Sequence, residues 1–181
     1  MRRRVITDAL DRTDGRVCRI RDFRSPFMFS CCGGDEILLV RRCNTGFEDG
    51  RLSLVAGHVE PGESVTQAAL REVSEEVGLT LSRDGLLVVG VMHRRSREER
   101  VDFFLAYRLG DWEEPVNREP EKCSVLVWAS QASLPDDTIA YVRAGIVNFR
   151  NGVWFQEFGW ESVRSNDAAQ PTGTRNARPG G

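Results

Sequence analysis

The stretch GHVEPGESVTQAALREVSEEVGL, residues 57–79, constrains the fold more than any other part of this 181-residue chain. Pro61 and Gly62 form a turn signal, Ser64 is suited to cap the start of a helix, and Gly78 is suited to end it in a left-handed conformation. We therefore predict a helix over residues 65–77. Its apolar face would consist of Ala69, Leu70, Val73 and Val77.

Three glutamates, Glu72, Glu75 and Glu76, lie within about 100° of one another around this predicted helix, because residues three and four apart are neighbours. Like charges at this spacing repel one another. Magnesium prefers oxygen ligands and shares its coordination shell between carboxylates and substrate phosphates. The three glutamates therefore predict a divalent-metal site, and a solvated acidic helix face is the alternative.

Short apolar runs separated by turn signals predict strands around this helix. We expect strands at residues 27–32, 36–42, 52–56, 86–93, 100–109 and 125–129, and a second helix over residues 137–150. The glycine pair after the first run and the charged stretch RRSREE before the fifth would be hairpin turns. Strands mixed with two helices predict an α/β fold with a mixed sheet that is covered on both faces.

Two of these strands carry a prediction about burial. Residues 86–93 are almost all apolar, so we expect that strand to be buried on both faces. In residues 100–109 apolar side chains alternate with others, so we expect one buried face. That face would consist of Val101, Phe103, Leu105, Tyr107 and Leu109.

A chain of this length fits one domain with a sizeable core. We expect that domain to span residues 17–164, after a partly flexible N-terminal segment at residues 1–16. Residues 165–181 contain no apolar side chain larger than alanine and are rich in glycine, proline and polar groups. They predict a disordered tail, because such a segment cannot bury enough surface to fold.

Composition limits the location and the partners. No apolar run approaches the roughly 18 residues of a membrane-spanning helix, and the basic N-terminus lacks the apolar segment of a secretory signal. The formal net charge of −2 argues against a general nucleic-acid binder. We therefore expect a cytoplasmic protein that binds neither membranes nor nucleic acid. The aromatic segment at residues 152–160 leaves a homodimer open.

The pattern in residues 57–79 resembles the signature of the Nudix hydrolases, the superfamily that includes the MutT-like pyrophosphohydrolases. Gly57, then five residues, Glu63, then seven residues, and REVSEEVGL from Arg71 to Leu79 match it at every defined position. The strands from about residue 27 to 163 also look like those of the family. The resemblance implies a Nudix-type α/β/α sandwich with a mixed central sheet and a loop-helix-loop metal site.

The resemblance also implies roles for the matched glutamates. Glu72, Glu75 and Glu76 stand where the family binds Mg²⁺ or Mn²⁺. A backbone carbonyl near Ala56 or Gly57 would complete the metal shell. Glu72 is also a candidate for activating the attacking water.

The remaining catalytic candidates lie at the edge of the signature and beyond it. Arg71 is similar to the family arginine that orients carboxylates, and Glu63 would pair with it to hold the loop against the helix. In some members of the family a glutamate outside the signature serves as the base. Here Glu119 and Glu121 precede a predicted strand, and the spacing to Trp128 favours Glu121.

Candidates for substrate binding are side chains that can contact phosphate and rings that can stack on a base. Arginine can bind phosphate through two hydrogen bonds, although surface arginines are expected in an arginine-rich chain. Phe103 is also expected in the core. The candidates are Arg41, Arg42, His58, His93, Phe47, Phe103 and Phe104.

The resemblance implies hydrolysis of a phosphoanhydride in a nucleoside diphosphate derivative. The compact chain is similar to the MutT-like group, so a nucleoside triphosphate, cleaved to monophosphate and pyrophosphate, is the first expectation. A nucleotide-sugar or another nucleoside diphosphate derivative is the alternative. A third reading is a nucleotide-sensing domain without turnover, but such domains usually lose the signature glutamates that this chain keeps.

Overall fold

The computed structural model describes residues 26–33, 35–108 and 114–160. The predicted N-terminal segment at residues 1–16 and the predicted tail at residues 165–181 lie outside the described residues. In the described part, no helix has the length and apolar character needed to cross a membrane.

The described chain alternates strands with two α-helices, as the sequence predicts. In order, the elements are β1 (Pro26–Gly33), β2 (Glu36–Arg42), β3 (Leu52–Ser53), β4 (Val55–His58), α1 (Val65–Val77), the single 3₁₀ turn η1 (Arg83–Gly85), β5 (Leu87–Arg95), β6 (Glu99–Arg108), β7 (Cys123–Ser130), α2 (Ala140–Arg150) and β8 (Phe155–Phe158). The predicted α/β class is confirmed.

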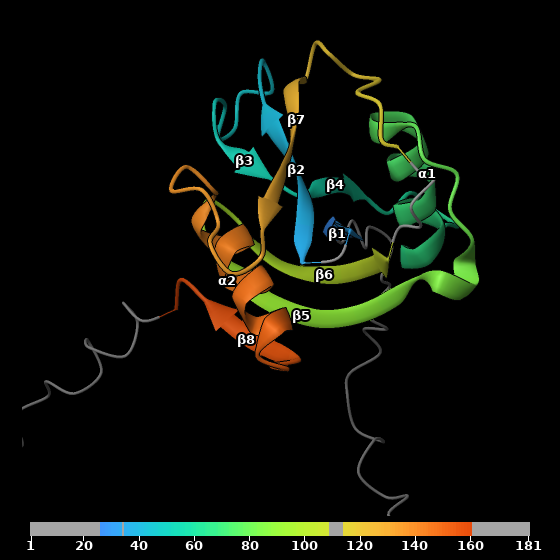
Figure 1. The fold of residues 1–181 in the computed structure, drawn as a ribbon. Helices are drawn as coiled ribbons and strands as arrows, with labels where there is room; N and C mark the ends of the chain where they lie inside the picture. Colours follow the sequence, from blue (N-terminus) through green and yellow to red (C-terminus); the bar gives the residue numbers. More distant parts are fainter. Residues whose placement is uncertain (1–25, 34, 109–113, 161–181) are drawn as a thin grey trace, which may run out of the picture.

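The strands form one mixed sheet in the order β3-β2-β1-β6-β5-β8, with β4 paired to β1 and β7 paired to β2. The pairs β1–β6 and β5–β8 are parallel and the other pairs are antiparallel. Helices α1 and α2 lie on opposite sides of the sheet (Figure 1).

Strand β2 shows why the sheet has a helix on each side. Leu38 and Val40 pack in one core cluster with Val73 of α1, whereas Ile37 and Leu39 pack in the other with Ile146 of α2. Successive side chains of a strand point to opposite faces, so four consecutive buried residues require cover on both. The predicted sandwich therefore follows from the continuous apolar run in β2.

Helix α1 begins and ends where its local sequence predicts. The Ser64 hydroxyl accepts from the backbone N–H of Gln67 at 3.3 Å, and the Gln67 side chain accepts from the N–H of Ser64 at 2.9 Å. Gly78 ends the helix at φ 71°. The predicted apolar face is wrong in one member, because Ala68 is buried and Leu70 only half-buried. The helix packs mainly on β4, which turns its buried face toward Ala68.

The predicted burial of β5 on both faces is wrong. Leu87 is 62% exposed and Val88 is 43% exposed. Strand β8 pairs with β5 only from Val91 onward, so the first residues of β5 lie at an open edge of the sheet.

The predicted face of β6 is also incomplete. Phe103, Leu105 and Tyr107 do pack toward α1, but Val101 is exposed, and Leu109 lies outside the described residues. The opposite face is buried as well, because α2 covers it, and it includes the fully buried Asp102.

Two boundaries differ from the predictions for a similar reason. The expected strand at residues 52–56 divides at Leu54, because β3 pairs with β2 and β4 pairs with β1. Helix α2 begins at Ala140 rather than Asp137, because Thr138 N–H bonds to the Pro135 carbonyl and Ile139 N–H bonds to the Leu52 carbonyl. Long-range backbone pairing divides the strand, and a local turn together with one long-range hydrogen bond delays the start of the helix.

Candidate functional site

Arg71 joins the loop before α1 to the helix itself. Its Nε and Nη2 each donate to a Glu63 oxygen at 3.0 Å, and Nη2 also donates to the His58 carbonyl at 3.2 Å. Its Nη1 lies 3.0 Å from Glu72 and donates to Glu75 at 3.2 Å. The hydrogen bond from Arg71 lowers the pKa of Glu63. The predicted pairing of Arg71 with Glu63 is therefore present in the geometry.

Glu76 and Glu72 are partly buried carboxylates on α1. Burial, with Glu72 and Glu119 adding repulsion, raises the pKa of Glu76 from 4.5 to about 8. Burial also raises the pKa of Glu72, and the hydrogen bond from Arg71 opposes the shift. A carboxylate with so little compensation favours a cation as its partner. The donor set of hard oxygen atoms fits Mg²⁺ or Mn²⁺.

Strand β4 comes very close to α1 at Gly57. A Cβ atom at this position would overlap the carboxyl group of Glu72. Only glycine leaves room there, because it has no side chain. The backbone beside Gly57 therefore lines the same space as the Glu72 carboxylate, as a metal shell with a backbone oxygen requires.

Glu72, Glu76 and Glu119 line a hollow of about 300 Å³ between α1, β4 and the loop before β7, which we call the acidic hollow. Glu119 also accepts from Lys122 Nζ at 2.7 Å. The Glu121 side chain is exposed and does not line this hollow. The spacing argument that favoured Glu121 therefore has no support in the geometry, which favours Glu119.

The expected convergence of Glu72, Glu75 and Glu76 is not seen. The Glu75 side chain is 55% exposed and bonds to Arg71, outside the acidic hollow. Over the described ranges, no three or more His, Cys, Asp and Glu side chains are grouped so that they could hold a metal ion. The same Arg71 Nη1 lies near both Glu72 and Glu75, but of these two only Glu72 also lines the hollow. The metal assignment stays a prediction.

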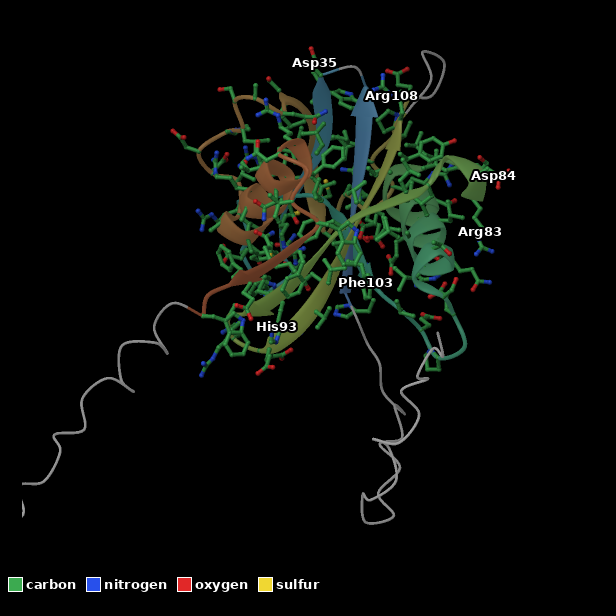
Figure 2. All side chains as sticks on the ribbon, turned by 90° about the horizontal axis from the view of Figure 1, so that it is seen from below. Asp35, Arg83, Asp84, His93, Phe103 and Arg108 are labelled. Carbon is green, nitrogen blue, oxygen red and sulfur yellow. The ribbon has the colours of Figure 1, made fainter. Side chains whose placement is uncertain are left out.

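Of the four predicted substrate contacts other than the aromatic rings, Arg42 and His58 lie at the site. His58 lines the acidic hollow, and its Nε2 lies 3.1 Å from Arg100 Nη1. Arg41 instead donates to Asp137 at 2.5 Å and to the Gly50 carbonyl at 2.6 Å, so it holds two loops together. His93, labelled in Figure 2, lies on β5 beside β8 and bonds to Glu99 at 3.0 Å; it does not line the hollow.

The aromatic candidates also separate. Phe104 is buried in the core on the α2 side, and Phe103 packs against the core on the α1 side. Phe47 lines a second hollow, of about 400 Å³, which we call the arginine cavity. This cavity is lined by Arg42, Phe47, Ala56, Gly57, His58, Arg94, Ser96, Arg97, Glu98, Arg100 and Tyr141. The RRSREE segment, four of whose residues line this cavity, was predicted only as a hairpin turn, and its density of arginine is the signal in the sequence that points to the cavity.

Comparisons with known proteins agree with this geometry. A model of the NUDIX domain matches residues 24–148. Over 48 residues the chain is 54% identical to "NAD-capped RNA hydrolase NudC" of Stutzerimonas stutzeri (strain A1501), which is 26% of this chain and 17% of that protein. Over 66 residues it is 41% identical to "ADP-ribose pyrophosphatase" of Methanocaldococcus jannaschii, covering 36% of this chain and 37% of that protein. The matches thus span well under half the length of these two curated relatives.

Among solved structures, the chain is similar to the MutT NUDIX hydrolase from Burkholderia pseudomallei. The TM-score is 0.61 at 25% sequence identity, and the match covers 68% of this chain and 95% of that one. The similarity therefore extends well beyond the signature at residues 57–79.

Proposed function

The chain belongs to the NUDIX domain family of hydrolases, and on that premise we propose that it cleaves a phosphoanhydride in a nucleoside diphosphate derivative with the help of Mg²⁺ or Mn²⁺. One observation carries the proposal: the partly buried Glu76 lines the acidic hollow together with Glu72 and Glu119, beside the backbone of Gly57. Such an acidic pocket would attract divalent ions and hold them next to a bound diphosphate.

In this proposal Glu72, Glu76 and Glu119 hold the metal, with a backbone carbonyl at Ala56 or Gly57. Glu75 belongs to the predicted ligand set and would have to leave Arg71 to join it. A bound ion would neutralise charge on the diphosphate and polarise its phosphorus atom. Arg71 is a positioning residue, because it fixes Glu72 relative to the loop through Glu63 and His58.

The attacking water would lose its proton to a carboxylate that lines the acidic hollow. A base works best when its pKa lies near the working pH, and burial raises the pKa of Glu72 in that direction. Glu119 is the second candidate, since it lies across the same hollow. The exposed Glu121 is the weakest of the three.

The scissile linkage is clearer than the group attached to it. A nucleoside triphosphate is the first substrate expected from the compact MutT-like domain, with monophosphate and pyrophosphate as products. A nucleoside diphosphate joined to a larger group is the second candidate, and the arginine cavity beside the acidic hollow favours it by its size. In this proposal the protein acts in the cytoplasm on a small nucleotide, and binds neither nucleic acid nor membranes. A homodimer is compatible with it.

The test is a panel of nucleotides with the purified protein and MgCl₂. We expect phosphate-containing products from at least one of ATP, dGTP, UDP-glucose, ADP-ribose and NAD⁺, and none when EDTA replaces MgCl₂. Binding without product from every member of the panel would overturn the proposal in favour of a nucleotide sensor.

A further inference from the structure

The arginine cavity continues directly from the acidic hollow. Both are lined by Arg42, Ala56, Gly57 and His58. The far side of the arginine cavity comes from the β5–β6 hairpin, through Arg94, Ser96, Arg97, Glu98 and Arg100. A ligand held at the acidic hollow can therefore extend into a space whose lining includes four arginines.

These arginines differ in how far their charge is already neutralised. Arg94 is buried, bonds to the buried Asp102 at 2.5 Å and lies over the Tyr141 ring, 4.2 Å from its centroid. Arg94 therefore stabilises the fold, and its charge is already neutralised by Asp102. Arg42 donates to the Phe47 carbonyl and to the Thr45 hydroxyl, both at 2.9 Å, and neither acceptor carries a formal charge.

Arg97 and Arg100 are better placed to meet an incoming anion. The Arg97 side chain forms no ion pair with any residue that the structure describes. Arg100 pairs with Glu98, whose side chain is 66% exposed, so a stronger anion can compete for it. Because Glu98 is the one carboxylate among the lining residues, the cavity has an excess of positive charge.

The size of the cavity indicates more than a lone ion. Its volume of about 400 Å³ lies within the range of small-molecule sites, and Phe47 and Tyr141 add aromatic surface. A further hollow of about 410 Å³ shares Phe47, Ser96, Arg97 and Tyr141 with it. Arg97 thus lies where two adjoining hollows meet, and a phosphate bound there has room beyond it for the rest of a molecule.

We propose that the arginine cavity binds a further phosphate of the substrate, which lies outside the scissile diphosphate and is not cleaved. The substrate class is then a nucleoside diphosphate derivative with an additional phosphate group on its distal part. Arginine favours phosphate through paired hydrogen bonds, and the charge of the scissile diphosphate would already be met by metal at the acidic hollow. The guanidinium groups of Arg42, Arg97 and Arg100 therefore remain available to bind another anion. This inference rests on the proposed function for its substrate and on the cavity for its binding site.

The first experiment measures binding without turnover. Isothermal titration in EDTA compares AMP with adenosine 2′,5′-bisphosphate and with adenosine 3′,5′-bisphosphate. We expect at least one bisphosphate to bind about tenfold more tightly than AMP, and the two isomers distinguish where the extra phosphate lies. Equal affinities for all three would overturn the inference.

Variants assign the effect to residues. Arg97→Gln should reduce the affinity ratio of bisphosphate to AMP to less than about threefold. Arg95→Gln is the matched control, because Arg95 lies on the same hairpin but packs over Trp160, 5.2 Å from its centroid. Glu98→Gln should raise the ratio, since it releases Arg100. The assignment would be contradicted if the affinity ratio of bisphosphate to AMP fell in Arg95→Gln or stayed unchanged in Arg97→Gln.

The second experiment measures turnover with Mg²⁺ on NADP⁺ and NAD⁺, which differ by one phosphate. We expect the kcat/KM ratio of NADP⁺ to NAD⁺ to exceed one in the wild type and to fall in Arg97→Gln but not in Arg95→Gln. A ratio of one in the wild type counts against the inference. If neither compound is cleaved while the bisphosphate preference persists, the proposed function fails and the binding site stands.

Discussion

Arg71 holds Glu63 through two parallel hydrogen bonds, Nε to Oε1 and Nη2 to Oε2, each 3.0 Å long. Both side chains are largely shielded from solvent. The pair closes the loop after β4 onto α1 at the point where Arg71 also contacts Glu72. One guanidinium group therefore couples the stability of the loop to the position of a candidate metal ligand.

Arg71→Lys tests this coupling. Lysine keeps the charge but cannot form the paired hydrogen bonds, so we expect unfolding free energy in EDTA to fall by about 1 kcal/mol. We also expect kcat/KM on the best substrate to fall, because Glu72 loses its orientation. Expressed as a free energy, this loss should exceed the loss of unfolding free energy. Arg51→Lys, at the exposed Arg51–Glu48 pair, is the control and should change neither quantity appreciably. Equal effects of the two substitutions would contradict the coupling.

Glu76→Gln tests the metal assignment. Turnover with MgCl₂ should fall by roughly two to four orders of magnitude, because the Glu76 carboxylate lines the acidic hollow and is a proposed metal ligand. The fold should stay intact, and thermal unfolding in EDTA should occur at the same or a higher temperature, since the amide has no buried charge. Glu60→Gln on the exposed loop is the control. Normal turnover by Glu76→Gln would remove the metal site from this position.

Glu119→Gln and Glu121→Gln form a matched pair two residues apart. We expect Glu119→Gln to lower kcat by about a hundredfold, because Glu119 lines the acidic hollow, and Glu121→Gln to change it little. Lys122→Gln breaks the ion pair with Glu119 and shows how much of the loss comes from a loosened loop. A larger loss in Glu121→Gln would restore the preference that sequence spacing gave.

The pH dependence of stability follows from Glu76. Its pKa is about 8 in the folded protein against an ordinary 4.5, so the unfolded chain releases this proton first as pH rises. In EDTA, the free energy of unfolding should therefore be highest below pH 4.5 with respect to this group and should fall as pH rises toward 8. Mg²⁺ should stabilise the protein more at pH 8 than at pH 6. Urea unfolding of wild type and Glu76→Gln measures both effects, and identical pH slopes in the two proteins would refute the assignment.

Local signals predicted the centre of the fold well. The bounds of α1 follow from Ser64 and Gly78, whose capping effects act within one turn of the helix. The exposure of Leu87 and the burial of Asp102 could not be predicted in the same way. Leu87 depends on where β8 stops pairing with β5, and Asp102 depends on α2 and Arg94 arriving from elsewhere in the chain.

The residues of the candidate site also fall into those that local sequence predicts and those that depend on long-range structure. Glu63, Arg71 and Glu72 lie close in sequence, so the signature was sufficient to expect their contact. The assignment of Glu119 over Glu121 needed the path of the loop before β7. The arginine cavity needed the register of β5 and β6, in which Arg94 points to the buried side while its neighbour His93 faces Trp160. No spacing rule in the sequence carries that information.

At Gly57 a single hydrogen atom stands where every other amino acid has carbon, and the Glu72 carboxyl group occupies the room that this leaves. The gap between strand and helix is therefore set by a missing methyl group. An alanine there would have to push the carboxylate aside or pry α1 off the sheet. The site thus depends on the absence of a side chain at Gly57 as much as on its charged side chains.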